Sequence, residues 1–130
     1  MDVNPVSVTA AQLEVAAATF DLLSVAPRLN LVVILASGES DVSTLAKLSG
    51  QAIPAASQQL AKLRAAGIVA ARREGRRQLY RVDDPHILTV IEQMFRHIGP
   101  EGTIVPAPSA PGRPTARRAR RPRFTAVSGG

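Results

Sequence analysis

Residues 41–69 read DVSTLAKLSGQAIPAASQQLAKLRAAGIV, two apolar helical patterns with a glycine between them. Gly50 suits the positive φ that ends a helix, and Pro54 suits the first turn of the next one. The stretch therefore predicts two short helices, 43–48 and 54–66, joined by a tight turn. Their inward side chains recur at helical spacing: Leu45, Leu48, Leu60 and Leu63.

A different period follows at residues 71–84, ARREGRRQLYRVDD. Short runs of nearly alternating apolar and polar residues flank Glu74 and Gly75, which is typical of a β-hairpin with glycine in its turn. A hairpin directly after a helix-turn-helix is a wing. Together the two stretches predict a winged helix-turn-helix.

Three further helices are expected around this centre. Residues 10–23 show helical spacing, with Thr9 as the N-cap. Residues 28–36 are apolar nearly all round, a pattern that a buried strand shares, but their helical neighbours favour a buried helix. Residues 85–98 carry a wide apolar face, which favours packing on a large surface such as a second copy of the chain. The predicted fold is mainly α with a small β-hairpin, in the order α-α-α-α-β-β-α.

Composition limits the kind of protein. At 130 residues and 45% hydrophobic, the chain is long enough for one domain with its own core. The absence of Cys excludes disulfides, thiolate metal ligands and a Cys nucleophile. Its first residues lack the basic segment of a secretory signal, and its longest apolar run is too short to span a bilayer. We therefore expect a soluble, cytoplasmic protein without a membrane partner.

Charge and composition divide the chain. The net charge is +6, and residues 98–130 hold six Arg against a single acid, Glu101. This end is rich in Pro, Gly and Ala and shows no hydrophobic period, which is typical of disorder. We expect a flexible N-terminus at 1–9, a folded domain at 10–101, and a disordered, basic Pro/Arg-rich tail at 102–130.

The motifs resemble those of the ArsR/SmtB-type winged-helix repressors of bacteria and archaea. The resemblance covers roughly residues 10–101 and rests on the two stretches above together with APRLNLVVIL at 26–35. It departs from the family pattern at Pro27, where Thr is more common, and at Gln59, where His is common. The resemblance implies a DNA-binding transcriptional regulator, an autoregulated repressor and not an enzyme. It also implies a homodimer that pairs through its first and last helices and binds double-stranded operator DNA.

Residues that could read DNA gather on the second helix of the pair and on the wing. Short polar side chains near the start of a recognition helix reach base edges in the major groove, and Gln can pair bidentately with adenine. Arginines at a hairpin tip suit phosphate or minor-groove contacts. Both sets also suit plain solvated positions, and charged residues guard an exposed strand edge against pairing. The predicted DNA-binding residues are Thr44, Ser57, Gln58, Gln59, Lys62, Arg72, Arg73, Arg76 and Arg77.

The two histidines, His86 and His97, are eleven residues apart on the expected last helix. At about 100° and 1.5 Å per residue they share a helix face but lie about 16 Å apart, so one ion cannot bind both within one helix. An antiparallel partner helix would place the partner subunit's His97 beside Asp84 and His86. Some members of the family have such a site, and the resemblance gives these three residues as ligands. The family's fourth position falls on Pro100, which cannot coordinate through its side chain. Glu101 is one place further and could substitute if the helix has ended at Gly99.

A ligand set of nitrogen and oxygen without thiolates suits Zn(II), or Ni(II) and Co(II) with more ligands. The resemblance implies that such a metal would release the repressor from its operator. The same residues also have a structural explanation. Asp84 before Pro85 is an ordinary N-cap, and His97 suits the last turn of a helix.

Other functions stay open at this point. The chain could be a repressor of the same fold that does not sense metal, a less specific DNA-coating protein that uses its basic tail, or an adaptor that binds proteins at the wing edge. An enzyme has no support in the sequence, which offers no Gly-rich phosphate loop and no nucleophile–base pair.

Overall fold

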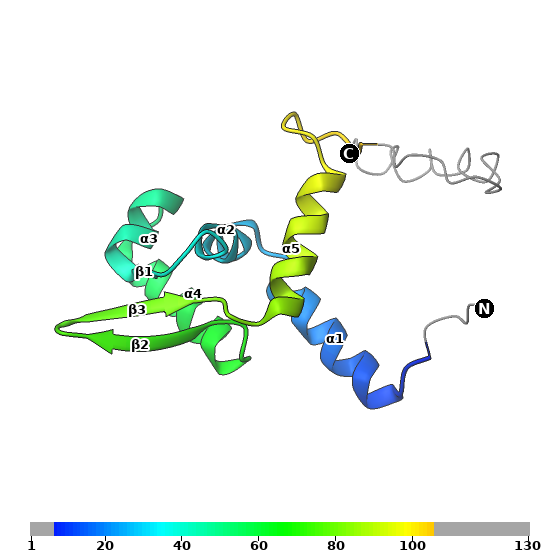
Figure 1. Cartoon of the computed structure of the whole chain (residues 1–130), viewed down its shortest axis with the longest axis horizontal. Coiled ribbons are helices and arrows are strands. Elements are labelled where there is room, and N and C mark those ends of the chain that lie inside the picture. The colour runs from blue at the N-terminus through cyan, green and yellow to red at the C-terminus, as the bar shows by residue number, and fades with distance from the viewer. Residues whose placement is uncertain (1–6, 106–130) are drawn as a thin grey trace. The chain divides into compact units, whose positions relative to one another are not determined.

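The computed structural model describes residues 7–105 of the chain. Its contacts divide it into two units, whose described parts are residues 7–93 and 94–105. The first unit holds a helix-turn-helix and a hairpin whose turn projects beyond the helices (Figure 1). The second holds the last residues of the final helix and a short turn.

The helices follow the predicted ones within one or two residues at most ends, and the first is closed by a capping box. Thr9 accepts a hydrogen bond from the backbone N–H of Gln12, and the Gln12 side chain accepts one from the N–H of Thr9. This reciprocal pair satisfies two N–H groups that a helix start leaves without partners. The bounds are α1 Ala10–Leu22, α2 Ala26–Leu35, α3 Val42–Ser49, α4 Ile53–Ala65 and α5 Pro85–His97.

The turn between α3 and α4 has the expected left-handed glycine. Gly50 has φ 70°, and the N–H of Gln51 donates to the carbonyl of Ala46 at 2.9 Å. The Gln51 side chain also donates to the carbonyl of Pro27 at 3.1 Å, which ties the turn to the start of α2. These two hydrogen bonds fix the turn both to the end of α3 and to the start of α2.

The sheet has one strand more than predicted. Strands β2 (Ala70–Glu74) and β3 (Arg77–Arg81) form the expected hairpin around Gly75, which has φ 64°. Residues Ser40–Asp41 form β1, which pairs antiparallel with β3, so the strand order is β1-β3-β2. The sequence predicted only a break at this point. A strand of two residues is too short to show an alternating pattern.

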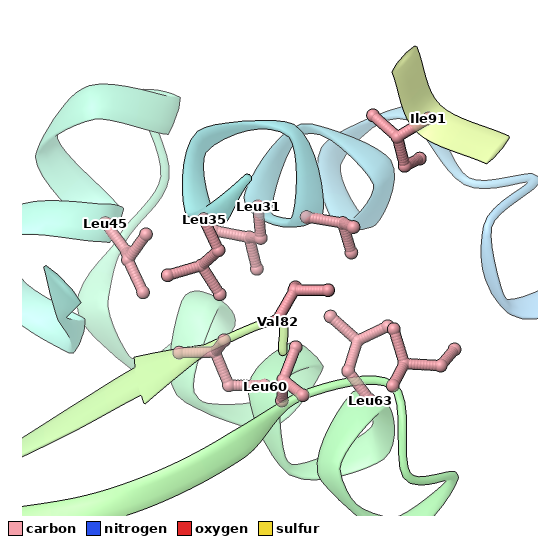
Figure 2. Packing of buried hydrophobic residues seen from close by; sticks show 10 residues of the cluster. Leu31, Leu35, Leu45, Leu60, Leu63, Val82 and Ile91 are labelled. Atoms are coloured by element: carbon pink, nitrogen blue, oxygen red, sulfur yellow. The ribbon is translucent and has the colours of Figure 1, made fainter. Parts of the chain in front are cut away.

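The core joins α2, α3 and α4 to the base of the hairpin (Figure 2). The apolar segment that could have been a strand is helix α2, and its Leu31, Val32 and Leu35 are buried. Helix α1 has no buried residue. The core cluster consists of Leu31, Val32, Leu35, Leu45, Leu60, Leu63, Ile68, Val69, Val82 and Ile91.

Ordered structure continues past the predicted end of the domain at residue 101. The N–H of Gly99 donates to the carbonyl of Thr103, and the N–H of Val105 donates to that of His97, both at 2.7 Å. Residues 102–105 therefore belong to a turn that folds back on the end of α5. Residues 106–130 of the predicted tail, and residues 1–6 of the predicted flexible N-terminus, lie outside the described residues.

Within residues 7–105, no single helix is long and apolar enough to cross a membrane. Helices α1 and α2 together reach that length and composition, but a bend of 95° separates them.

Candidate nucleic-acid interface

Helix α4 presents a polar face to solvent. It buries Ala56, Leu60 and Leu63 against the core, and its first turn contains Pro54. Three of the side chains predicted to contact DNA lie on the exposed side of this helix: Ser57, Gln58 and Lys62. Their placement agrees with the orientation that base contact would require.

Gln59 does not share this exposed side. It lies three residues after buried Ala56 and four before buried Leu63, so it falls at the margin of the buried stripe. The residue is half-buried, and its Oε1 atom is buried without a hydrogen-bond partner among the described residues. The prediction that Gln59 points outward with Gln58 is wrong, because the helical spacing turns it toward the core.

An open hollow of about 480 Å³ lies between α4 and β3. It is lined by Ser57, Ala61, Arg64 and Ala65 of the helix and by Tyr80 of the strand. The sequence prediction omitted Arg64 and Tyr80. For Arg64 a signal exists, because positions 57, 61 and 64 share one helix face. Tyr80 could be placed there only once the hairpin had been packed on α4.

Asp41 organises the start of the first helix of the pair. Its carboxylate accepts a hydrogen bond from the N–H of Thr44 at 2.8 Å, as an N-cap does. Hydrogen bonds from Thr44, together with the charge of Arg77, hold the pKa of Asp41 below its usual 3.8. Thr44, a predicted DNA contact, is exposed in this first turn.

The four wing arginines differ in their surroundings. Arg72 donates through Nε and Nη2 to both carboxylate oxygens of Glu39, each at 2.8 Å. Arg77 lies 3.2 Å from the carboxylate of Asp41. Among residues 7–105, neither Arg73 nor Arg76 forms an ion pair. The sequence could not show which of these arginines are paired, because Glu39 is 33 residues from Arg72.

The predicted metal ligands at the start of α5 are adjacent. Asp84 Oδ1 accepts a hydrogen bond from the backbone N–H of His86 at 2.8 Å and lies 3.2 Å from His86 Nδ1. The bond from the His86 backbone, with a smaller effect of the His86 charge, lowers the pKa of Asp84. Asp84 is therefore the N-cap that its sequence context predicted.

His97 and Glu101 belong to the second unit. His97 ends α5, and Glu101 is exposed in the turn that follows. The condition for Glu101 to act as a substitute ligand, a helix that has ended by Gly99, is met. No group of three or more His, Cys, Asp or Glu residues in the described part of one chain could hold a metal ion.

Sequence comparison agrees with this geometry. The family model described as "Bacterial regulatory protein, arsR family" matches residues 27–71, which run from α2 through the helix pair into β2. The chain is 39% identical over 84 residues to the HTH-type transcriptional regulator KmtR of Mycobacterium tuberculosis. That match covers 62% of this chain and 65% of KmtR, a little under two thirds of the relative.

Solved structures give the same result. The homodimeric winged helix-turn-helix DNA-binding domain of Mb0332 from Mycobacterium bovis, described as a possible ArsR-family transcriptional regulator, is 33% identical with a TM-score of 0.63. The similarity covers 67% of this chain and 81% of that one. The antimony-specific transcriptional repressor AntR is 32% identical with a TM-score of 0.65, covering 72% and 85%. KmtR is a transcriptional regulator, AntR is a transcriptional repressor, and Mb0332 is described as a possible regulator. The chain belongs to the ArsR family of bacterial regulatory proteins and has their winged helix-turn-helix fold.

Proposed function

We propose that the protein is an autoregulated repressor that binds double-stranded operator DNA in the cytoplasm. The observation that carries this proposal is the exposed polar face of α4, with Ser57, Gln58 and Lys62, next to a hairpin that carries arginines. An α-helix with short polar side chains at its start fits the major groove. Arginines of the hairpin fit phosphates or the minor groove beside it.

Exposed apolar side chains on α1 support a homodimer. Leu13, Val15 and Phe20 have 62%, 66% and 60% of their surface exposed, and α5 adds half-exposed Val90. A soluble monomer has little reason to leave so many large apolar side chains in water on one helix. The homodimeric domain of Mb0332 is a precedent for self-association. Two copies would place two recognition helices on two half-sites of one operator.

A divalent metal, Zn(II), Ni(II) or Co(II), is the proposed effector. The ligands would be Asp84 and His86 of one protomer with His97 of the partner subunit, and Glu101 as the fourth group. The donor set fits, because Asp84 already lies 3.2 Å from His86 Nδ1 and the His86 side chain is 93% exposed. The antimony specificity of AntR is a precedent for ion sensing by a similar protein.

Repression and release then follow from one dimer equilibrium. In the proposed DNA-binding state the two α4 helices match successive major grooves and block transcription. When bound, the metal would bridge the last helices of the two protomers. Metal binding would therefore favour a second dimer geometry, in which the two α4 helices no longer match successive major grooves. The metal effect is the free-energy difference that ligand binding imposes between the two dimer states.

The test is fluorescence anisotropy with DNA from upstream of the protein's own gene. The full chain is measured with chelator and then titrated with Zn(II), Ni(II) and Co(II). The double variant His86→Ala/His97→Ala removes both imidazoles, and Gln93→Ala on the exposed side of α5 is the matched control. Tight binding that one metal weakens in the wild type and in Gln93→Ala, but not in the double variant, supports the whole proposal.

A repressor of the same fold that does not sense metal is the second candidate. One observation favours it: the Asp84–His86 contact is accounted for by capping of α5 alone. Tight operator binding that is indifferent to every metal and to both substitutions would establish this candidate. Binding to random-sequence DNA that equals operator binding at moderate salt would instead indicate a less specific DNA-coating protein.

A further inference from the structure

The wing arginines lie on two faces of one small sheet. In the strand register, Arg72 of β2 and Asp41 of β1 both stand opposite Leu79 of β3, and Glu74 stands opposite Arg77. Residues opposite each other point to the same face, so these side chains share the face of Leu79. Arg73 stands opposite Gln78 and points to the other face. Arg76 lies in the two-residue turn.

The shared face carries its own acids. Glu39, one residue before β1, binds Arg72, while Glu74 lies 3.7 Å from Arg72 and Asp41 lies 3.2 Å from Arg77. Each of these arginines therefore has a carboxylate within reach before DNA arrives. The hydrogen bond from Arg72 holds the pKa of Glu39 below its usual value, so Glu39 is ionised at neutral pH.

Whether an arginine–carboxylate pair of the wing persists beside DNA depends on the number and length of its hydrogen bonds. Exposed ion pairs usually contribute little, and a phosphate could displace a single loose contact. The Arg72–Glu39 pair is bidentate, with two parallel bonds of 2.8 Å, and its side chains are 47% and 30% exposed. Bidentate guanidinium–carboxylate pairs are the strong exception among surface ion pairs. A phosphate would have to replace both bonds and would also meet the Glu39 charge.

We propose that Glu39 is a positioning residue that neutralises Arg72 and ties β2 to the residue before β1, so that the wing meets the DNA backbone through Arg73, Arg76 and the loosely paired Arg77. This rests on the proposed operator binding. The wing then contributes three phosphate-binding charges per protomer, one fewer than its four arginines. Glu39 restrains the affinity for DNA of any sequence, because each extra phosphate contact adds binding energy that is independent of sequence.

The experiment measures the salt dependence of DNA binding by the full chain for four variants. Each phosphate contact contributes about −0.9 to the slope of log K against log salt concentration. Arg73→Gln should make the slope shallower by about one unit for each copy in contact with a phosphate. Glu39→Gln leaves Arg72 with only the looser contact to Glu74 at 3.7 Å. Binding to random-sequence DNA at about 0.1 M salt should therefore strengthen by up to roughly tenfold per contact. Arg72→Gln exposes the Glu39 carboxylate to phosphate and should weaken binding.

The decisive variant is the double substitution Glu39→Gln/Arg72→Gln, which has the same net charge as the wild type. If Arg72 is neutralised, the double variant recovers the wild-type slope and affinity that Arg72→Gln lost. A double variant as weak as Arg72→Gln would mean that Arg72 itself contacts phosphate, which overturns the inference. So would a Glu39→Gln slope equal to that of the wild type. Thermal unfolding of each variant separates these effects from loss of folded protein.

Failure of the proposed operator binding would give a different result from failure of the Glu39 inference. A wild-type chain that binds no DNA at low salt would overturn the proposed operator binding, and this inference with it. A wild-type chain that binds DNA, but with equal losses for Arg72→Gln and Arg73→Gln and no recovery in the double variant, would overturn the inference alone.

Discussion

Two neighbouring glutamines in α4 have different environments, and this makes them a test of the DNA-reading face. Gln58 is exposed, whereas Gln59 is half-buried at the margin of the core. We expect Gln58→Ala to weaken operator binding by about 1–3 kcal/mol, the loss typical of one bidentate base contact. Gln59→Ala should leave operator affinity close to that of the wild type. Fluorescence anisotropy with the operator measures both.

A second duplex identifies the base. Changing the adenine that Gln58 reads should weaken the wild type but leave Gln58→Ala unaffected, because the partner side chain is already absent. Equal losses of affinity for Gln58→Ala and Gln59→Ala would contradict the orientation of α4.

Asp41 couples the stability of the helix pair to pH. Hydrogen bonds from Thr44 lower the pKa of its carboxyl below 3.8 in the folded chain, so folding favours the ionised form. The stabilisation is fully present above pH 3.8 and is lost as pH falls below that value through the folded pKa. Asp41→Asn keeps a capping oxygen but cannot titrate. We expect the free energy of unfolding, from urea denaturation between neutral pH and about pH 2, to fall more steeply in the wild type.

The comparison is specific to Asp41. Glu39 and Asp84 also have lowered pKa values, but both remain in the variant and contribute to both curves alike. Parallel curves for the wild type and Asp41→Asn would show that the Thr44 hydrogen bonds do not set the acid stability of the protein.

At the scale of the element, local pattern predicted the helices, the hairpin and Gly50. Helical spacing, caps and glycine turns act between residues a few positions apart, and these are visible in a sequence. Strand β1 and the partners of Arg72 depend on contacts between segments that are far apart in the chain. The same division between local pattern and distant contacts applies to the candidate DNA-binding site. Ser57, Gln58 and Lys62 followed from helical phase, whereas Tyr80 required the packing of the hairpin on α4.

The turn between α3 and α4 depends on the backbone freedom of Gly50. Its φ of 70° is left-handed, and a Cβ added there would meet no atom within 4 Å. Gly50→Ala should therefore destabilise the fold through backbone strain alone, by about 1–2 kcal/mol in urea denaturation. Gly50→Asn should cost less, because Asn adopts this conformation more readily. If the two variants are equally destabilised, side-chain packing and not φ controls the turn.

At the scale of the whole molecule, the exposed apolar residues of α1 imply a second copy. Leu13 on α1 and Leu48 on α3 are 62% and 61% exposed, so the prediction that Leu48 points inward is wrong. Leu→Asp is therefore the same change at two equally solvated sites. Burying one Leu side chain stabilises by about 1.5–3 kcal/mol. A two-fold interface contains the same Leu from both protomers, so the contribution to dimer stability is doubled. We expect Leu13→Asp to raise the dimer dissociation constant by roughly 150-fold or more, measured by sedimentation velocity. Leu48→Asp should leave it unchanged.

Operator binding supplies a second readout for the same pair of variants. A Leu13→Asp monomer covers one half-site, so its affinity for a whole operator should fall toward its affinity for an isolated half-site. The wild-type dimer should bind the whole operator much more tightly than the isolated half-site. A Leu13→Asp chain that stays dimeric, or dissociation in Leu48→Asp instead, would place the interface away from α1. The exposed side chains Leu13, Val15 and Phe20 would then require another partner, because a helix with no buried residue gains little from the core of its own chain.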